Sequence, residues 1–297
     1  MDKMNRIVAA TDFSPRADRA VHRAAQLAAQ QRAELTLLHV ISALPLEAFK
    51  HLLSETPLEI EQKLVDLAHT RLQELAASLH ADTGIAASTH VSIGRVHAQI
   101  NGYAQASGAD LVVIGAHGEH FLQDVFLGTT ASKVLDHGRH PLLIVRNTRF
   151  DPYQRILVPV DFSRPSRLAL RTALAMADPA SIYVLHAFEV PFEGEMLYAG
   201  VSGETVRQYR AQALNDARQQ MQAFLADLAG EGAARVIEQG YAPAVIREQS
   251  QALGADLIVI GKRGETELDE ELLGSVTKHV MYETTCDLLV VTPDAGR

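Results

Sequence analysis

The feature that most constrains the fold is an internal duplication, because the second half of this 297-residue chain repeats the first. Asp12-Phe13-Ser14 returns as Asp161-Phe162-Ser163, and residues 108–115 return as residues 254–261. A sequence that repeats itself at a fixed period uses one structural unit more than once. We therefore expect two copies of one domain, and the expected domains are 1–148 and 153–297.

Each half alternates apolar segments of strand length with segments of helical periodicity. The expected strands are 6–10, 34–40, 85–91, 111–114 and 141–145 in the first half, and 156–160, 182–187, 234–238, 257–260 and 288–291 in the second. Continuous apolar runs such as 111–114 are typical of parallel strands buried on both faces. Repeated strand–helix units predict open parallel sheets covered by helices, with ligands bound beyond the carboxyl ends of the strands.

A glycine pattern follows the fourth expected strand of each half. It reads Gly115-x2-Gly118-x9-Gly128-Thr129 in the first half and Gly261-x2-Gly264-x9-Gly274-Ser275 in the second. Glycine has no Cβ, so the backbone turns tightly and can approach a phosphate closely. The start of a helix attracts anions through its N–H groups and its dipole. Glycines that only end a strand and begin a helix are the alternative, but the repeated spacing favours an oxyanion ligand.

This glycine spacing, together with the Asp-Phe-Ser turn after the first strand, resembles the nucleotide-binding branch of the universal stress protein family. The resemblance covers nearly the whole chain as two tandem copies, and residues 261–291 match the family signature closely. It implies a Rossmann-like α/β fold of two tandem five-stranded parallel sheets in the order 3-2-1-4-5. It also implies ATP or a related adenine nucleotide as the ligand. The two domains would pair through their last strands as an intrachain pseudo-dimer, and a further homodimer stays open.

The resemblance also assigns the nucleotide-binding residues by position. In the first half these are Asp12 and Val40 at the adenosine end, and Gly115, Gly118, Gly128, Thr129 and Thr130 around the ribose and phosphates. In the second half they are Pro159, Asp161 and Ala187 at the adenosine end, and Gly261, Lys262, Arg263, Gly264, Gly274, Ser275 and Val276 around the ribose and phosphates. The first half departs from the family in having Ala10 where the second has Pro159.

Several of these residues also have a purely structural explanation. Asp12 and Asp161 precede expected helices, where an aspartate forms an Asx turn or caps the helix. Such a turn leaves room for a ligand contact as well. His39 and His186 occupy equivalent positions in the second strand of each half, and we expect half-buried histidines with satisfied hydrogen bonds there rather than catalytic groups.

Acidic residues bear on the question of metal ions. Residues 265–273 carry five carboxylates beside the expected phosphate site, so a triphosphate bound there would require Mg²⁺ or Mn²⁺ as a counter-ion unless the acids face solvent. His117, His120 and Asp124 lie close together in the first half. They match no metal-site motif, so no metal bound by protein side chains is expected.

Composition narrows the class of partner. The chain has 36 acidic residues against 27 Lys and Arg, a net charge of −9, which disfavours binding to nucleic acids or anionic membranes. Cys286 is the single cysteine, so no intrachain disulfide forms and a reducing compartment is expected. No apolar run approaches the roughly 20 residues of a membrane span. These observations favour a cytoplasmic protein.

The sequence does not identify an enzyme. It contains neither the Walker phosphate-binding loop, nor the dinucleotide fingerprint after the first strand, nor the nucleophile elbow of hydrolases. We therefore expect an ATP-binding protein with a regulatory or stress-survival role, for which slow ATP hydrolysis stays open. The alternatives are an ATPase or nucleotidyl-transfer enzyme of the same fold, and an interaction scaffold that binds no nucleotide.

Overall fold

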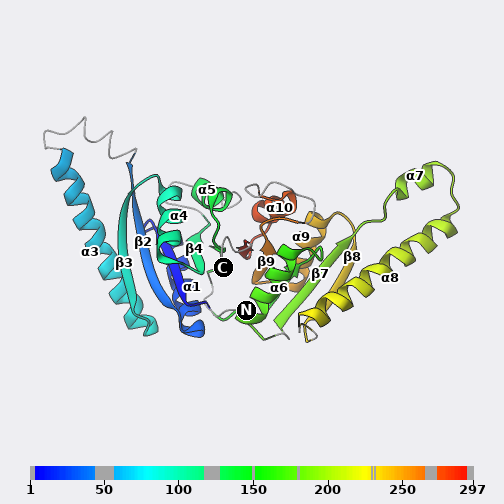
Figure 1. The fold of residues 1–297 in the computed structure, drawn as a ribbon, viewed down its shortest axis with the longest axis horizontal. Helices are drawn as coiled ribbons and strands as arrows, with labels where there is room; N and C mark the ends of the chain where they lie inside the picture. Colours follow the sequence, from blue (N-terminus) through cyan, green and yellow to red (C-terminus); the bar gives the residue numbers. More distant parts are fainter. Residues whose placement is uncertain are drawn as a thin grey trace. The chain divides into compact units, whose positions relative to one another are not determined.

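The structure is a computed structural model that describes residues 4–43, 57–116, 128–148, 151–178, 181–228, 230, 232–264 and 273–292. The chain forms two compact units, one built on Asp2–Pro152 and the other on Tyr153–Val291 (Figure 1). Each unit is described by itself.

The first unit is a five-stranded parallel sheet with strand order β3-β2-β1-β4-β5, as expected. Its elements are β1 (Arg6–Thr11), α1 (Pro15–Gln31), β2 (Glu34–Ser42), α3 (Pro57–Thr83), β3 (Ala87–Gly94), α4 (Val96–Ser107), β4 (Leu111–Gly115), α5 (Thr129–His137) and β5 (Leu142–Val145). Helix α1 packs against α3, and α4 packs against α5. Right-handed crossovers place these two pairs on opposite faces of the sheet.

The second unit repeats this arrangement with strand order β8-β7-β6-β9-β10, again parallel. Its elements are β6 (Ile156–Pro159), α6 (Arg164–Met176), β7 (Ile182–Phe188), α7 (Glu193–Tyr198), α8 (Gly203–Asp227), β8 (Ala234–Gln239), α9 (Ala242–Leu253), β9 (Leu257–Gly261), α10 (Ser275–Glu283) and β10 (Asp287–Val291). The α/β class and the strand order predicted for each half are therefore confirmed.

The short helix α7 was not predicted from the sequence. It packs on α8, and the two helices extend beyond the sheet of their unit in Figure 1. Arg210 of α8 forms an ion pair with Glu193, whose carboxylate also accepts a hydrogen bond of 2.9 Å from the Gln239 side chain. Apolar side chains of this segment remain exposed, most of all Tyr198 at 96%.

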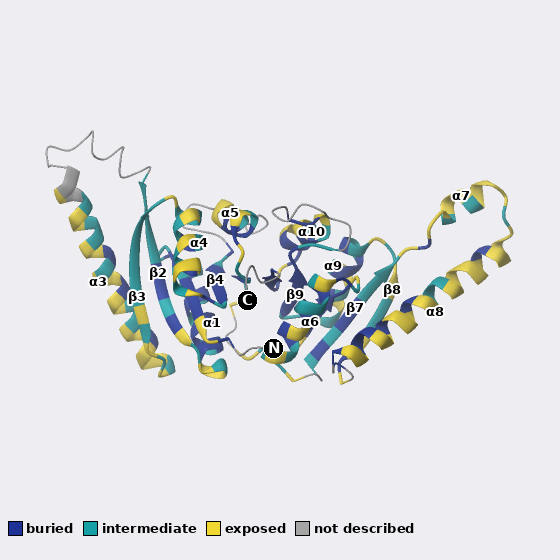
Figure 2. Cartoon of the chain, viewed as in Figure 1, coloured by how far each residue is buried: buried dark blue, intermediate teal, exposed yellow. Residues whose placement is uncertain are grey.

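Burial follows the order of the strands. The central strands β4 and β9 and the strand β10 are almost entirely buried, whereas the edge strands β3 and β8 are largely intermediate or exposed (Figure 2). Strands covered by helices on both faces require apolar side chains at successive positions, which explains the continuous runs in the sequence. None of the helices in the described ranges has the length and apolar character needed to cross a membrane.

The strand order sets the place of a binding site. The chain leaves β1 in one direction along the sheet and returns to β4 on the other side of β1, and β6 and β9 are related in the same way. Helices that diverge on opposite faces leave a crevice at the carboxyl ends of these two strands. Both units therefore present their crevice where the Asp-Phe-Ser turn and the glycine segment begin.

Candidate functional site

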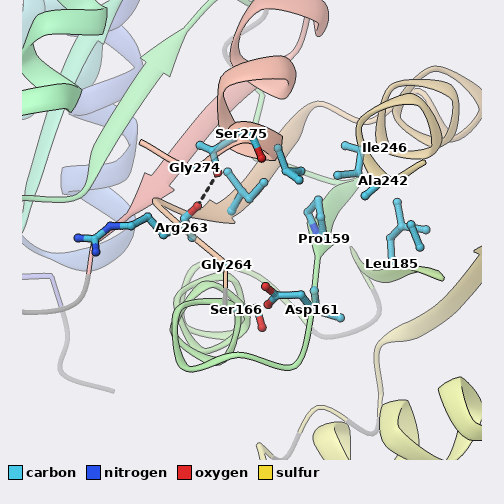
Figure 3. Close-up of a pocket in the computed structure, with 16 residues that line it drawn as sticks. Pro159, Asp161, Ser166, Leu185, Ala242, Ile246, Arg263, Gly264, Gly274 and Ser275 are labelled. Atoms are coloured by element: carbon cyan, nitrogen blue, oxygen red, sulfur yellow. Dashed lines mark hydrogen bonds between the residues drawn. The ribbon is translucent and has the colours of Figure 1, made fainter. Parts of the chain in front are cut away.

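A cleft of about 330 Å³ lies at the carboxyl ends of β6, β7 and β9 in the second unit (Figure 3). It brings together nine of the ten residues predicted for this half, namely Pro159, Asp161, Ala187, Gly261, Arg263, Gly264, Gly274, Ser275 and Val276. Residues from three strand ends and from the start of α10 thus converge on one space. Its volume lies at the lower end of the range for small-molecule sites.

The remaining predicted residue, Lys262, is not part of the described lining and is only 4% exposed. Arg263 lines the cleft, but Figure 3 shows its guanidinium directed away from the other labelled side chains. The positive charges that the sequence places beside the phosphate site therefore do not point into the cleft in this structure.

The first unit has a corresponding cleft of about 400 Å³. Its described lining includes Asp12, Val40, Gly115, Gly128, Thr129 and Thr130, all of which were predicted. Gly118 lies outside the described residues, as do His117, His120 and Asp124. Nearly every lining position of one cleft has its counterpart in the other at the spacing of the duplication. The repeat in the sequence is therefore a repeat of one site.

The Asp-Phe-Ser segments form the turn that starts one wall of each cleft. The carboxylate Oδ1 of Asp12 accepts the backbone N–H of Ser14, and Asp161 accepts that of Ser163, both at 3.1 Å. These are Asx turns, so the structural explanation of both aspartates is correct. The intervening Phe13 and Phe162 have φ values of 63° and 64°. Non-glycine residues rarely adopt this left-handed conformation, and they concentrate at functional sites where the surroundings enforce it.

Two histidines support these turns from the second strand of each unit. Nδ1 of His39 lies 2.8 Å from the carbonyl oxygen of Thr11, and Nδ1 of His186 lies 2.9 Å from that of Val160. Each ring also packs against the phenylalanine of the turn, at 4.4 Å and 4.3 Å between ring centroids. Burial is the largest influence on His39 and lowers its pKa. These are satisfied structural histidines, as the sequence predicted.

Close packing explains why two of the predicted positions are glycines. A Cβ added at Gly261 would lie 2.7 Å from the Cβ of Pro165, and one at Gly115 would lie 3.1 Å from the carbonyl oxygen of Arg16. The last residue of β4 or β9 thus sits directly under the start of the helix that follows the first strand. Both glycines line their clefts, but the helix contact already requires them whatever the ligand.

The helices that follow the glycine segments begin without a side-chain cap. Gly128 and Gly274 occupy the N-cap positions of α5 and α10, where neither can supply a capping oxygen. Their own N–H groups donate to the carbonyl oxygens of Ala116 and Lys262, at 2.8 and 2.9 Å. Helices α1 and α6, in contrast, are capped by the serine side chains of the Asp-Phe-Ser turns. The positive ends of α5 and α10 therefore face the clefts, and neither N-cap residue supplies a capping side chain.

Each cleft also has an apolar wall that was not predicted from the sequence. Val96 and Ile100 of α4 form it in the first unit, and Ala242 and Ile246 of α9 form it in the second. A helix that follows the third strand also starts at the carboxyl edge of the sheet, so the i, i+4 spacing of these residues was the available signal. Ala242 of the second unit is equivalent to Val96 of the first, so this wall is less bulky in the second unit.

Thr277 links the helix start to the strand end in the second unit only. Its hydroxyl donates a 2.8 Å hydrogen bond to the carbonyl oxygen of Gly261, and the residue is 2% exposed. The equivalent residue in the first unit is Ala131, which has no hydroxyl. The hydroxyl therefore braces α10 against β9 rather than facing a ligand.

Thr277→Val is expected to lower the free energy of unfolding of the second unit by about 1–3 kcal/mol. Valine keeps the shape of threonine but leaves the buried carbonyl of Gly261 without this donor. Chemical denaturation followed by circular dichroism measures the change, and Thr130→Val, at an exposed helical position, is the control. Equal stability of the Thr277→Val chain and the wild type would show that the hydroxyl does not contribute to the free energy of unfolding.

The described residues contain no group of three or more His, Cys, Asp or Glu side chains able to hold a metal ion. The acidic residues 265–272 lie outside the described ranges. Within the described lining each cleft has one carboxylate, Asp12 or Asp161.

Comparison with known proteins gives a consistent result. Residues 3–146 and 152–292 both match the universal stress protein family. Universal stress protein A homolog 2 of Coxiella burnetii is 30% identical over 149 residues, which cover 49% of this chain and 97% of that protein. A universal stress protein of Mycolicibacterium smegmatis is 24% identical over 97% of both chains. The crystal structure of a universal stress protein from Archaeoglobus fulgidus shares the fold, with a TM-score of 0.72, 19% identity and coverage of 98% of this chain and 99% of that one.

Proposed function

The chain belongs to the universal stress protein family as a tandem member, and from this premise we propose that each unit binds one adenine nucleotide. The observation that carries the proposal is the recurrence of one cleft, at the same place in two units, with matching lining residues. Two sites that keep a turn in a strained conformation and a helix without a cap have retained features that folding alone does not require.

The chemistry of each cleft changes from one end to the other. One end has aliphatic side chains, including Leu38 and Val40 in the first unit and Leu185 and Ile246 in the second. A planar heterocycle such as adenine fits an apolar wall of this kind. Asp12 or Asp161 stands at the end of the neighbouring strand, where a carboxylate can accept hydrogen bonds from ribose hydroxyls or base amino groups.

The other end suits a phosphate chain. The first turns of α5 and α10 direct N–H groups and the positive end of the helix dipole toward the cleft. Thr129, Thr130 and Ser275 add hydroxyl donors at the same end. A Mg²⁺ or Mn²⁺ ion would be held mainly by the phosphates, since each described lining has a single carboxylate.

We propose a regulatory or stress-survival role in which the nucleotide acts as a ligand. The described lining of both clefts contains no His, Cys, Lys or Tyr, so its ionisable groups are the aspartates and Arg263. Both aspartates are already engaged in Asx turns. General-base catalysis requires a group within reach of the attacking water with a suitable pKa. This set of residues supports binding more than turnover.

Isothermal titration of the full chain with ATP, in the presence and absence of Mg²⁺, tests the proposal. We expect two nucleotides bound per chain and at most slow turnover in a phosphate-release assay. The panel includes ADP, AMP and cAMP, since one solved universal stress protein is in complex with cAMP. A flat titration with every nucleotide would overturn the proposal and favour an interaction scaffold. Fast turnover that Asp161→Ala abolishes while binding persists would favour an enzyme.

A further inference from the structure

The exposed face of α5 carries a row of residues that begins in the first-unit cleft. Thr129, Lys133 and His137 follow one another at intervals of four residues and therefore lie on one side of the helix. All three are exposed, and Thr129 lines the cleft. Lys133 is one helical turn, or about 6 Å, beyond Thr129, and His137 is two turns beyond it.

A second pair of basic residues meets this row from α4. The rings of His97 and His137 lie 5.5 Å apart between centroids, so the first turn of α4 and the last turn of α5 meet at this point. Arg95 is the N-cap residue of α4, and Val96, between Arg95 and His97, lines the cleft. We call Arg95, His97, Lys133 and His137 the basic cluster.

The basic cluster contains little negative charge of its own. Helix α4 has no acidic residue, and α5 has only Asp136. The pKa of His97 is lowered, first by burial and then by the positive charges of His137, Lys133 and Arg95. Nδ1 of His137 donates to the carbonyl oxygen of Lys133 at 3.0 Å. Like charges gathered in this way are stabilised by an external anion.

The second unit provides an internal comparison. The residues equivalent to Arg95, His97, Lys133 and His137 are Tyr241, Pro243, His279 and Glu283. There Nη1 of Arg247, on α9, lies 3.4 Å from the carboxylate of Glu283, on α10. The Tyr241 ring meets His279 edge-on at 6.2 Å. Among the described residues, the same pair of helices is thus joined by an ion pair in the second unit, whereas in the first unit it brings together four basic residues and one carboxylate, Asp136.

We propose that the basic cluster is a second anion-binding subsite, which receives the outer phosphoryl groups of a polyphosphate ligand held in the first-unit cleft. This inference rests on the proposed nucleotide function and goes beyond it by distinguishing the two units. The first unit prefers ligands with longer phosphate chains, whereas the second unit binds mainly through the helix start. An exposed cation about 4 Å from a phosphate oxygen is worth about a fivefold gain in affinity.

The subsite makes phosphate binding to the first unit dependent on pH. An anion favours the protonated form of His97, so its pKa is higher in the complex than in the free chain. By linkage, affinity is greatest below the pKa of free His97 and falls as the pH rises through its pKa in the complex. Asp136 is the one carboxylate on the two helices.

Proton NMR of the full chain tests the subsite directly, because it reads His97 and His137 individually. Inorganic tripolyphosphate is the probe, with sodium chloride of equal ionic strength as its control, and His97→Asn and His137→Asn assign the signals. We expect tripolyphosphate to raise the pKa of His97 by about half a unit or more and to shift the ring signals of His137. The ring signals of His279 in the second unit provide an internal reference and should shift less.

The double substitution Lys133→His with His137→Glu replaces two residues of the basic cluster by their second-unit equivalents. It tests whether the cluster contributes to nucleotide affinity. Calorimetry at pH 6 should show the affinity ratio of ATP to AMP falling about fivefold or more at one of the two sites. Lys278→Ala, which removes an exposed lysine from α10 of the second unit, is the matched control and should leave the ratio unchanged.

The outcomes separate the two proposals. If ATP binds but the histidine signals and the ATP-to-AMP ratio do not move, the subsite is wrong and the nucleotide function stands. If no nucleotide binds while tripolyphosphate still raises the pKa of His97 and shifts the signals of His137, the cluster is an anion site and the nucleotide function is wrong. If neither probe has an effect, both proposals fail.

Discussion

Val276→Asp is expected to lower the nucleotide affinity of the second unit by about a thousandfold without weakening its fold. Val276 lies in the first turn of α10 and lines the cleft where the phosphates are proposed to bind. A carboxylate about 4 Å from a phosphate charge costs about 4 kcal/mol at the effective dielectric of a protein surface. The same carboxylate at a helix N-terminus contributes about 0.3–1 kcal/mol to helix stability.

Because the substitution is expected to lower nucleotide affinity but to stabilise the helix, a loss of binding cannot be attributed to unfolding. Binding is measured by calorimetry and stability by the thermal midpoint, which should stay constant or rise. Val276→Asn has the shape of aspartate without its charge and should lose much less affinity. A Val276→Asp chain that still binds two nucleotides would place the phosphates away from the start of α10.

Gly264→Ala is the second substitution with a large expected effect. A Cβ at this position would lie 2.6 Å from Oδ2 of Asp161. The carboxylate cannot swing away freely, because its Oδ1 accepts hydrogen bonds from the N–H and the hydroxyl of Ser163. We expect about a tenfold or greater loss of nucleotide affinity in the second unit, and a cost of about 1–3 kcal/mol in stability from overpacking.

A double-mutant cycle with Asp161→Ala identifies the cause. If the clash with the carboxylate is responsible, Gly264→Ala should cost much less in the Asp161→Ala background than in the wild type. Asp161→Asn keeps an acceptor for the Asx turn and separates loss of the turn from loss of the charge. If Gly264→Ala lowers nucleotide affinity and stability equally in both backgrounds, its effect does not come from the contact with Asp161.

The order of strands and helices could be predicted because the apolar pattern of each strand occurs once in each half of the sequence. The run 111–114 is apolar throughout since both faces of β4 are covered, and its copy at 257–260 carries the same signal. The strand order itself came from the family resemblance, because periodicity does not encode which strands are neighbours. Helix α7 escaped prediction since it has only six residues and no buried face to impose a pattern.

The candidate site was predictable to the extent that it depends on backbone. The Asp-Phe-Ser turns and the glycine segments appear as short motifs, and the aspartates of the turns and the described glycines of the segments line the clefts. For the apolar wall from α4 and α9, the i, i+4 spacing indicates that the two residues share one side of their helix, but it does not show that this side faces the crevice. The position of Lys262 depends on burial, and no charge count along the chain reveals that a lysine is 4% exposed.

The backbone hydrogen bond from Gly128 to Ala116, and its copy from Gly274 to Lys262, affects how such domains can change in evolution. These hydrogen bonds are 2.8 and 2.9 Å long. They hold the residue after the strand to the N-cap residue of the following helix, whatever residues lie between the two. Lengthening a closed loop costs little, about 0.6 kcal/mol for each doubling. The join between the departing strand and the arriving helix is thus expected to keep its geometry when the number of residues between its two ends changes.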